Sequence, residues 1–417
     1  MAMDMRQGIA AVLTFSMFIM LGNMIKKDHI DPLLVTVPLS SRVQHDVLKV
    51  SRQHHVKLTS LRSGPWKEDL EILKPCWGKL AREVQKQTKG YIFFSLTNGP
   101  EYHVSQIGNA ITIAKHLGAA LVLPDVIGLN AREKRHFGEV YDTNKFMTSL
   151  EGIIEVVKDY PFEEPRQKIV TMKVPNRISK EFITTNIGPI FKRHKNLRIS
   201  SYFTSSILKN SQENKFFSPY ECLAMFGGLE LQKELQESVY LMVRTLQHLG
   251  SNGKFIAVDL EDADQVMKNN CHKNFTMNKC YDGKEIGQFL RKIGFERDTI
   301  IYLTQSGRND KSLISLRRYF PNTFTKEALI PVDMKPKYLG LKNFEFEKII
   351  DLNLCTKSDV FLVTSHNQFQ VGVVGMRIAS GNTQIFEFAR RISSTPSTDY
   401  LSPYIKKKSH MAYSCFC

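Results

Sequence analysis

The chain has 417 residues and a formal net charge of +16, from 57 Lys and Arg against 41 Asp and Glu. This length allows two domains plus appended segments. The basic residues are spread along the chain, without zinc-finger spacing, an RNP-type aromatic motif or a basic helix, which disfavours a nucleic-acid partner. The positive charge instead suits an anionic small ligand, an anionic lipid surface or solubility alone.

The N-terminus predicts a membrane anchor. Residues 1–8 form a short polar start, and residues 9–25 form an apolar run that is closed by Lys26 and Lys27. A helix over this run would span about 25 Å, enough for a thin bilayer. A cleaved secretory signal is the competing interpretation. Because no clear small-x-small cleavage site follows the run, we expect an uncleaved transmembrane anchor behind a cytosolic tail.

The sequence after the anchor predicts a luminal domain on a stem. Residues 26–75 are polar and lack apolar periodicity, which indicates a stem. The triplet Asn274-Phe275-Thr276 is an N-glycosylation acceptor and favours the lumen. By the positive-inside rule, Lys26 and Lys27 would favour the opposite orientation, but this rule is weak for a large following domain.

The seven cysteines show no paired C-x-x-C spacing of a zinc or thioredoxin site. Cys271 and Cys280 bracket the glycosylation triplet and could close a loop as a disulfide in an oxidising lumen. Buried free thiols are the alternative, and Cys222, which lies among apolar residues, is expected to be one. An odd count leaves at least one cysteine unpaired.

The folded part centres on residues 91–126. Residues 91–96 form an apolar run typical of a strand, residues 97–103 predict a turn-rich loop, and apolar residues then recur at helical spacing up to Leu117. Residues 119–123 predict a second buried strand. This is a βαβ unit whose first loop points at a helix N-terminus, where free backbone N–H groups can bind phosphate. An ordinary βαβ unit that binds nothing is the alternative.

Strand and helix patterns alternate through the rest of the chain. Strands are expected at residues 167–174, 197–203, 255–260, 299–304 and 359–363, and helices at residues 179–192, 222–249, 286–293, 312–319, 346–355 and 370–378. The two series predict an α/β protein with two Rossmann-like domains, residues 76–250 and 251–417. A ligand would bind in the crevice between the strand C-termini of the two halves.

Five segments occur in one order and at domain spacing: NGPEYHVSQIGNAITIAKHLGAALVLP, CLAMFGGLELQKEL, FIAVDL, TIIYLTQ and KSDVFL. With the N-terminal anchor, they resemble the plant O-fucosyltransferase-like glycosyltransferases over nearly the whole chain. The NGPEYH loop, the AVDL strand and the HMAYSCFC end are most similar to the mannan synthesis-related group of that family.

This resemblance implies a glycosyltransferase of the B type, with two Rossmann-like domains facing a crevice. It also implies a single-pass type II Golgi membrane protein whose luminal domain transfers a sugar, fucose by family default, from a GDP-sugar donor to a glycan with inversion. The first domain would then face the acceptor and the second the nucleotide sugar. The biological role implied is the synthesis of mannan, a cell-wall polysaccharide.

Three loops of the family contact the donor. They correspond here to the loop that begins at Gly99, the loop after residues 255–260 and the loop after residues 359–363. The donor-binding residues implied by the resemblance are Gly99, Pro100, Asp259, Glu261, Asp359, Ser365 and His366. A strand-end cap is the alternative role of Asp359.

The second of these loops departs from the family, which has an arginine there that neutralises the diphosphate, whereas this chain has Glu261. A guanidinium 4 Å from a phosphate charge contributes about 4 kcal/mol at an effective dielectric near 20, before desolvation. Either the donor binds weakly, or another cation, for which Arg317 and Arg318 are candidates, replaces the arginine. Asp262-Ala263-Asp264 has a D-x-D form, but a solvated acidic loop is favoured, so we predict no metal and no cofactor.

An inverting transfer needs a group that takes the proton of the acceptor hydroxyl. Some family members have a Pro-Glu pair in the first loop with Glu as the base, which implies Glu101 as the base, and His103 lies two residues further on. A loop-stabilising hydrogen bond is the alternative role of both residues. Because Glu261 replaces the arginine, the alternative function is a catalytically weak family member that acts as a non-enzymatic partner of a mannan synthase.

Overall fold

The computed structural model describes residues 65–66, 73–79, 87–128, 133–160, 169–203, 217–260, 281–305, 310–365, 367–389 and 397–417. By internal contacts the chain divides into residues 1–59 and residues 60–417, and all described residues lie in the second unit. Among these residues, no helix is long and apolar enough to cross a membrane. The predicted tail and anchor, residues 1–25, and most of the predicted stem lie outside the described residues.

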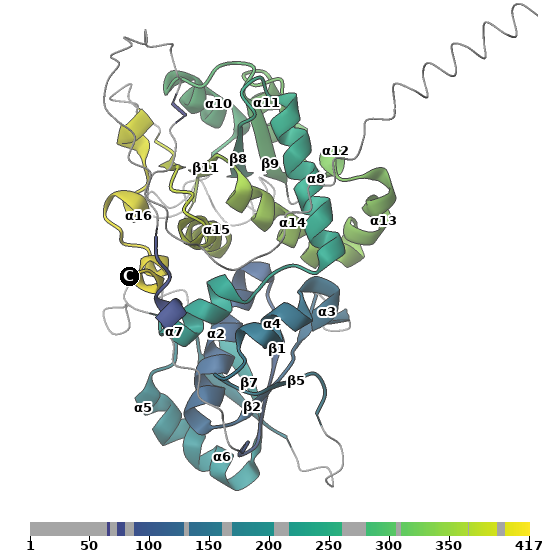
Figure 1. The fold of residues 1–417 in the computed structure, drawn as a ribbon. Helices are drawn as coiled ribbons and strands as arrows, with labels where there is room; N and C mark the ends of the chain where they lie inside the picture. The colour runs from purple at the N-terminus through teal and green to yellow at the C-terminus, as the bar shows by residue number, and fades with distance from the viewer. Residues whose placement is uncertain are drawn as a thin grey trace, which may run out of the picture. The chain divides into compact units, whose positions relative to one another are not determined.

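The first half of the described chain contains a mostly parallel sheet (Figure 1). Its strands are β1 (Tyr91–Leu96), β2 (Ala120–Val122), β3 (Asp125–Ile127), β4 (Lys134–His136), β5 (Val156–Val157), β6 (Val170–Pro175) and β7 (Asn196–Tyr202). β1 pairs in parallel with β2, β3 and β7, and only β4, which pairs with β3, runs antiparallel among these strands. The predicted strands at 91–96 and 197–203 are confirmed to within a residue.

Helices connect these strands. They are α2 (Pro100–Leu117), α3 (Phe137–Val140), α4 (Thr143–Ser149), α5 (Lys180–Phe182), α6 (Gly188–His194), α7 (Pro219–Cys222) and α8 (Lys233–Leu249). π-helical turns, Ile183–Ile187 and Leu223–Gly227, extend α5 into α6 and prolong α7. Helix α2 ends at Gly118, which adopts the left-handed conformation (φ 67°) that glycine tolerates without steric cost.

The second half contains a fully parallel sheet with the strand order β10-β9-β8-β11-β12. The strands are β8 (Phe255–Leu260), β9 (Ile300–Gln305), β10 (Thr323–Phe324), β11 (Val360–Val363) and β12 (Ile385–Glu387). The flanking helices are α10 (Gly283–Lys292), α11 (Asp310–Arg317), α12 (Lys326–Leu329), α13 (Lys335–Tyr338), α14 (Phe344–Lys357), α15 (Gln368–Ala379) and α16 (Pro403–Lys406). The predicted α/β class and the alternation of strands and helices are confirmed.

Helix α8 precedes residue 250 but packs against α14 and β9 of the second half (Figure 1). Its apolar stripe, which includes Leu235, Met242 and Leu246, is fully buried. The period of that stripe predicts a helix with one buried face, but it does not say which sheet covers the face. The sequence therefore placed α8 in the first domain, whereas its contacts join it to the second half.

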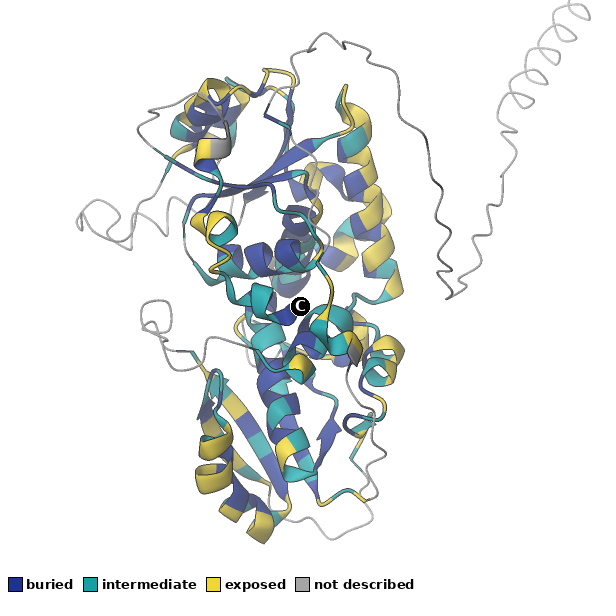
Figure 2. Ribbon diagram, turned by 60° about the vertical axis from the view of Figure 1, so that its left-hand side comes forward, coloured by how far each residue is buried: buried dark blue, intermediate teal, exposed yellow. Residues whose placement is uncertain are grey.

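One hydrophobic cluster runs through both halves, and a second lies on the far face of the second sheet. Side chains alternate between the two faces of the sheet along β8. Phe255 and Ala257 therefore belong to the first cluster, and Ile256 and Val258 belong to the second. Buried residues follow the strands of both sheets, and exposed residues gather on the outer faces of the flanking helices (Figure 2). Helix α2 lies against α14 and α15, so the two halves share a packed core at the crevice.

Two disulfides tie the C-terminal segment, which follows the second half, back to the first half. Cys415 bonds to Cys222 at the end of α7, across 193 residues of sequence. Cys417 bonds to Cys76, across 341 residues. The segment ends where residues of the first half begin, since the backbone N–H of Cys417 also donates to the carbonyl of Lys74.

The prediction that Cys222 is a free thiol is wrong. Apolar neighbours in sequence say only that a cysteine is buried, and its partner comes from the other end of the chain. Cys355 is the free, buried thiol among the described residues. The predicted pair, Cys271 and Cys280, and the glycosylation triplet at Asn274 lie outside the described residues.

Candidate functional site

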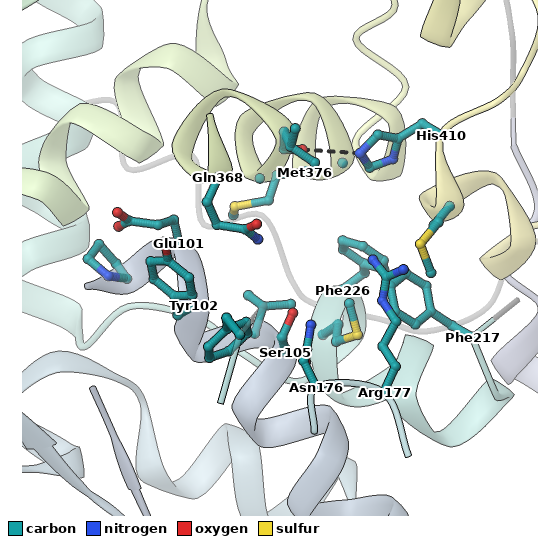
Figure 3. Close-up of a pocket in the computed structure, with 18 of the residues that line it drawn as sticks. Glu101, Tyr102, Ser105, Asn176, Arg177, Phe217, Phe226, Gln368, Met376 and His410 are labelled. Atoms are coloured by element: carbon teal, nitrogen blue, oxygen red, sulfur yellow. Dashed lines mark hydrogen bonds between the residues drawn. The ribbon is translucent and has the colours of Figure 1, made fainter. Parts of the chain in front are cut away.

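A pocket of about 440 Å³ lies between the two halves (Figure 3). Its wall in the first half includes the first turns of α2, the turn after β6, the π-helical turn after α7, and the side chains of Phe203 and Phe217. Its wall in the second half includes one face of α15, Leu352 of α14, Tyr404 of α16 and the C-terminal segment that the disulfides hold. The volume lies within the range of small-molecule sites.

Helix α2 begins earlier than the sequence indicated, because the predicted loop at residues 97–103 is helical from Pro100 onward. Gly99 has φ 106°, and a Cβ atom there would lie 2.6 Å from Oε2 of Glu101. Pro100 occupies the first helical position, where its fixed φ and missing N–H are no disadvantage. Gly99 and Pro100 therefore direct the N-terminus of α2 toward the pocket, as the βαβ pattern predicts.

Glu101 lines the pocket, but its carboxylate is bound to α14. Its Oε1 lies 2.8 Å from Nζ of Lys348, and only 8 % of the residue is exposed. The side of Glu101 that faces α15 is its backbone and Cβ, since a Cβ atom on Gly372 would lie 3.9 Å from Cβ of Glu101. In Figure 3 the Glu101 carboxylate points away from Gln368. The predicted base therefore sits at the pocket wall as half of an ion pair between the two halves.

His103 is fully buried and is not part of the pocket wall. Its Nδ1 lies 2.7 Å from the hydroxyl of Tyr141, and burial lowers the pKa of the imidazole to about 3. The helical start at Pro100 is the reason, because it turns position 103 toward the core while Tyr102 and Ser105 face the pocket. The structure thus contradicts the predicted catalytic role of His103 and favours the alternative, a structural hydrogen bond.

A second buried carboxylate lies close to Glu101. Glu345, in the first turn of α14, is 4 % exposed, and its Oε2 has no hydrogen-bond partner. Burial first, and then the negative charge of Glu101, raise the pKa of Glu345 to about 7, against the opposing charges of Lys348 and Arg135. We call Glu101, Glu345 and Lys348 the interface cluster. It places two carboxylates and one cation where α2 meets α14.

Asp259 organises the carboxyl edge of the second sheet. Its carboxylate accepts hydrogen bonds from the hydroxyl of Thr304 and from Nε2 of Gln370, the latter at 2.9 Å. Oε1 of Gln370 in turn accepts from the backbone N–H groups of Thr364 and Ser365, at 2.9 and 2.8 Å. The structure thus brings Asp259 and Ser365, two of the predicted donor-binding residues, together at the carboxyl ends of β8 and β11. Neither residue lines the described pocket.

Asp359 lies at the opposite edge of this sheet. It directly precedes β11, and its Oδ2 accepts a hydrogen bond of 2.9 Å from the backbone N–H of Phe255, the first residue of β8. Because the two strands are parallel, a residue before β11 lies at the amino edge, away from the crevice. The predicted donor contact of Asp359 is therefore wrong, and the alternative role as a strand-end cap holds.

The remaining predicted positions fall in two groups. Glu261, the Asp262–Asp264 pair and His366 lie outside the described residues. Arg317 donates from Nε and Nη2 to the carbonyl of Thr323, at 3.1 and 2.9 Å, and so holds α11 to β10, while Arg318 is exposed and not part of the pocket wall. Within the described ranges, no group of three His, Cys, Asp or Glu side chains could hold a metal ion.

Sequence reasoning missed several polar residues of the pocket wall. Asn176 and Arg177 follow β6, and His410 comes from the C-terminal segment. The imidazole of His410 lies 3.1 Å from the carbonyl of Val371 through Nε2, and its Nδ1 accepts from the N–H of Ala412, which holds the segment to α15. Burial lowers the pKa of His410 to about 4, so the ring is neutral. The only sequence signal for Asn176 and Arg177 was their place directly after an expected strand.

Comparison with known proteins identifies the family. Residues 91–379 match the family described as GDP-fucose protein O-fucosyltransferase, and the chain belongs to this family. Over the full length of both chains it is 44 % identical to Protein MANNAN SYNTHESIS-RELATED 1 of Arabidopsis thaliana and 40 % identical to Protein MANNAN SYNTHESIS-RELATED of Trigonella foenum-graecum. The resemblance seen in the sequence motifs is thus confirmed.

More distant similarities are also found. O-fucosyltransferase 11 of Arabidopsis thaliana is 23 % identical over 70 % of this chain and 56 % of its own length. Among solved structures, POFUT1 in complex with GDP shows 15 % identity and a TM-score of 0.44, over 73 % of this chain and 100 % of that chain. Family membership supports a glycosyltransferase activity.

Proposed function

We propose that this protein transfers a sugar, fucose by family default, from a GDP-sugar donor to a glycan acceptor in the synthesis of mannan-type polysaccharide. The observation that supports this most is the pocket of about 440 Å³ between the two α/β halves in a chain of the GDP-fucose protein O-fucosyltransferase family. End-to-end identity of 44 % with a mannan synthesis-related protein supports the polysaccharide context. The donor binds between the halves, and we propose no metal or other cofactor.

The proposed chemistry is a single inverting displacement. The acceptor hydroxyl oxygen attacks the anomeric carbon of the donor sugar, the bond from that carbon to the diphosphate breaks, and GDP leaves. Glu101 is the proposed acceptor of the hydroxyl proton, because it is the only acidic residue in the pocket wall among the described residues and its carboxylate would need only to turn from Lys348 toward the acceptor. Its ion pair with Lys348 places this step at the junction of the two halves.

The activity can be tested with the purified full-length chain, GDP-fucose or GDP-mannose, and manno-oligosaccharides. We expect GDP release and a lengthened or substituted oligosaccharide. Glu101→Gln should lower the rate by about 100-fold or more, which is the usual contribution of a general base. Glu237→Gln, on the exposed face of α8, is the matched control and should leave the rate unchanged. If the wild-type protein releases no GDP from any donor, it is not a transferase.

A non-enzymatic partner of a mannan synthase is the second candidate function. The observation that favours it is the state of the two predicted catalytic groups, since Glu101 is ion-paired and His103 is buried away from the pocket. Co-expression with a mannan synthase distinguishes the two functions. If the protein is a non-enzymatic partner, the wild type and Glu101→Gln should raise mannan output equally. If it is a transferase, the wild type should raise mannan output and Glu101→Gln should not.

We further propose that the protein is a type II membrane protein of the Golgi, with residues from 27 onward in the lumen. The apolar run at residues 9–25 and the two disulfides, which persist in oxidising compartments, support this location. Protease added to intact microsomes should leave the domain undigested, and detergent should remove this protection. Digestion in intact microsomes would contradict the topology.

A further inference from the structure

Arg177 is held in one orientation at the pocket wall by the turn after β6. Its backbone is left-handed (φ 63°), a conformation that costs a residue with a side chain on the order of 1 kcal/mol. Its backbone N–H donates to Oδ1 of Asn109 at 3.0 Å, and Nδ2 of Asn109 donates to the carbonyl of Pro175 and to Oγ of Ser201. Asn109 is 2 % exposed, so a buried side chain fixes the turn that presents Arg177.

The guanidinium group of Arg177 has no hydrogen-bond acceptor among the described residues. It lies over the ring of Phe217 at 5.6 Å, and its Nε is buried without a partner. Burial lowers the pKa of Arg177, and the negative charge of Glu221 opposes that shift without forming an ion pair within the described chain. Figure 3 shows the guanidinium directed toward the side of the pocket formed by His410.

An unpaired guanidinium in such surroundings is unfavourable unless a ligand accepts its hydrogen bonds, because desolvating a charge without a partner is costly. Arg177 is also the only cationic side chain in the pocket wall among the described residues, since His410 is neutral and Lys348 is paired with Glu101. A planar guanidinium offers two parallel N–H donors that match phosphate oxygens. The pocket therefore has one built position for an anionic group.

We propose that Arg177 binds the diphosphate of the GDP-sugar donor, and so supplies from the first half the positive charge that Glu261 does not supply after β8. This inference rests on the proposed function, because the donor provides the anion. Arg317 cannot take this role while it is bound to the carbonyl of Thr323, and Arg318 lies outside the pocket. The donor then bridges the halves, with its diphosphate at the turn after β6.

The test compares GDP, GMP and guanosine by calorimetric titration of the full-length protein and three variants. Arg177→Asn removes the charge and keeps the turn, because asparagine tolerates the left-handed backbone. We expect this variant to bind GDP about tenfold to 100-fold more weakly, in line with the loss of hydrogen bonds to a charged group. Guanosine should bind with less than about a twofold change, since it has no phosphate.

Two further variants complete the experiment. Arg177→Lys keeps the charge without the planar fork, and we expect it to recover part of the GDP affinity. Arg318→Asn removes an exposed arginine and should bind GDP like the wild type. Two results would overturn the inference without affecting the proposed function. One is unchanged GDP affinity in a folded Arg177→Asn variant, and the other is an equal loss of affinity for guanosine and for GDP. Absence of GDP binding by the wild type overturns the proposed function itself.

Discussion

Replacing Cys222 and Cys415 together by serine lowers the free energy of unfolding by about 2 to 5 kcal/mol. The disulfide joins the end of α7 to the C-terminal segment across 193 residues, so its loss releases a long loop in the unfolded chain. Both cysteines are fully buried, and the new hydroxyl groups would lie in apolar surroundings. The same segment carries His410 into the pocket wall, so we expect ligand affinity to fall with stability.

Urea unfolding followed by circular dichroism measures this change. Cys355→Ala is the control, because Cys355 is a buried cysteine that forms no disulfide. That variant should lose only the packing of one small side chain, about 1 kcal/mol. If the double serine variant loses no more unfolding free energy than the control does, the C-terminal segment is held by packing alone. The role assigned to the disulfide is then wrong.

Glu345→Gln raises stability at pH 8 by about 3 kcal/mol and leaves it almost unchanged near pH 4. The pKa of Glu345 is about 7 in the folded protein, because the carboxyl is buried and lies near the negative charge of Glu101. In the unfolded chain the pKa returns to its ordinary value of 4.5. The folded state therefore binds the proton more tightly than the unfolded state between these two values.

The direction of the pH dependence of stability follows from this difference in pKa. Wild-type stability is fully present below about pH 4.5 and falls as the pH rises through 7, because folding then has to bury a charged carboxylate. Glutamine imitates the protonated acid and removes this loss. Lys348 and Arg135 attract the charged form, which moderates the effect without reversing it, while Glu133 repels the charged form and adds to the effect.

Thermal melting of both proteins from pH 4 to pH 8 provides the measurement. The two melting temperatures should agree at the acid end, diverge as the pH rises above about 4.5, and reach a constant difference above about pH 7, with the variant higher. Glu237→Gln, on the exposed face of α8, is the control and should show no such divergence. If the melting temperatures of wild type and Glu345→Gln change in parallel with pH, Glu345 has the same ionisation in the folded and unfolded states. The interface cluster then does not raise the pKa of Glu345.

Much of the fold was predictable because its strands are short apolar runs. Residues 255–260 were predicted as a strand and form β8 with the same bounds, since every residue of that run is buried. Helices α10, α14 and α15 were predicted from periodicity to within a few residues at each end. The short strand β4, with three charged or polar side chains, carries no such pattern and was missed.

The site was harder to predict because it depends on contacts between distant parts of the chain. The family motif placed Glu101 at the crevice, but no local pattern shows that Lys348 occupies its carboxylate. Arg177 has no neighbouring motif, and its role follows from a left-handed turn and from a pocket that the C-terminal segment closes. Asp359 shows the reverse case, because the sequence placed it correctly at the start of a strand, and the start of a parallel strand lies at the amino edge of the sheet, away from the crevice.

Calorimetric titration of the full-length wild-type protein with GDP tests the central claim most directly, because the proposed donor, the pocket and the role of Arg177 all depend on it. We expect one GDP per chain with a dissociation constant between about 1 μM and 1 mM, the usual range for substrates of enzymes. Competition by a GDP-sugar for the same site should follow. A folded protein that gives no binding heat and does not retain GDP in equilibrium dialysis would contradict the assignment of a GDP-sugar pocket.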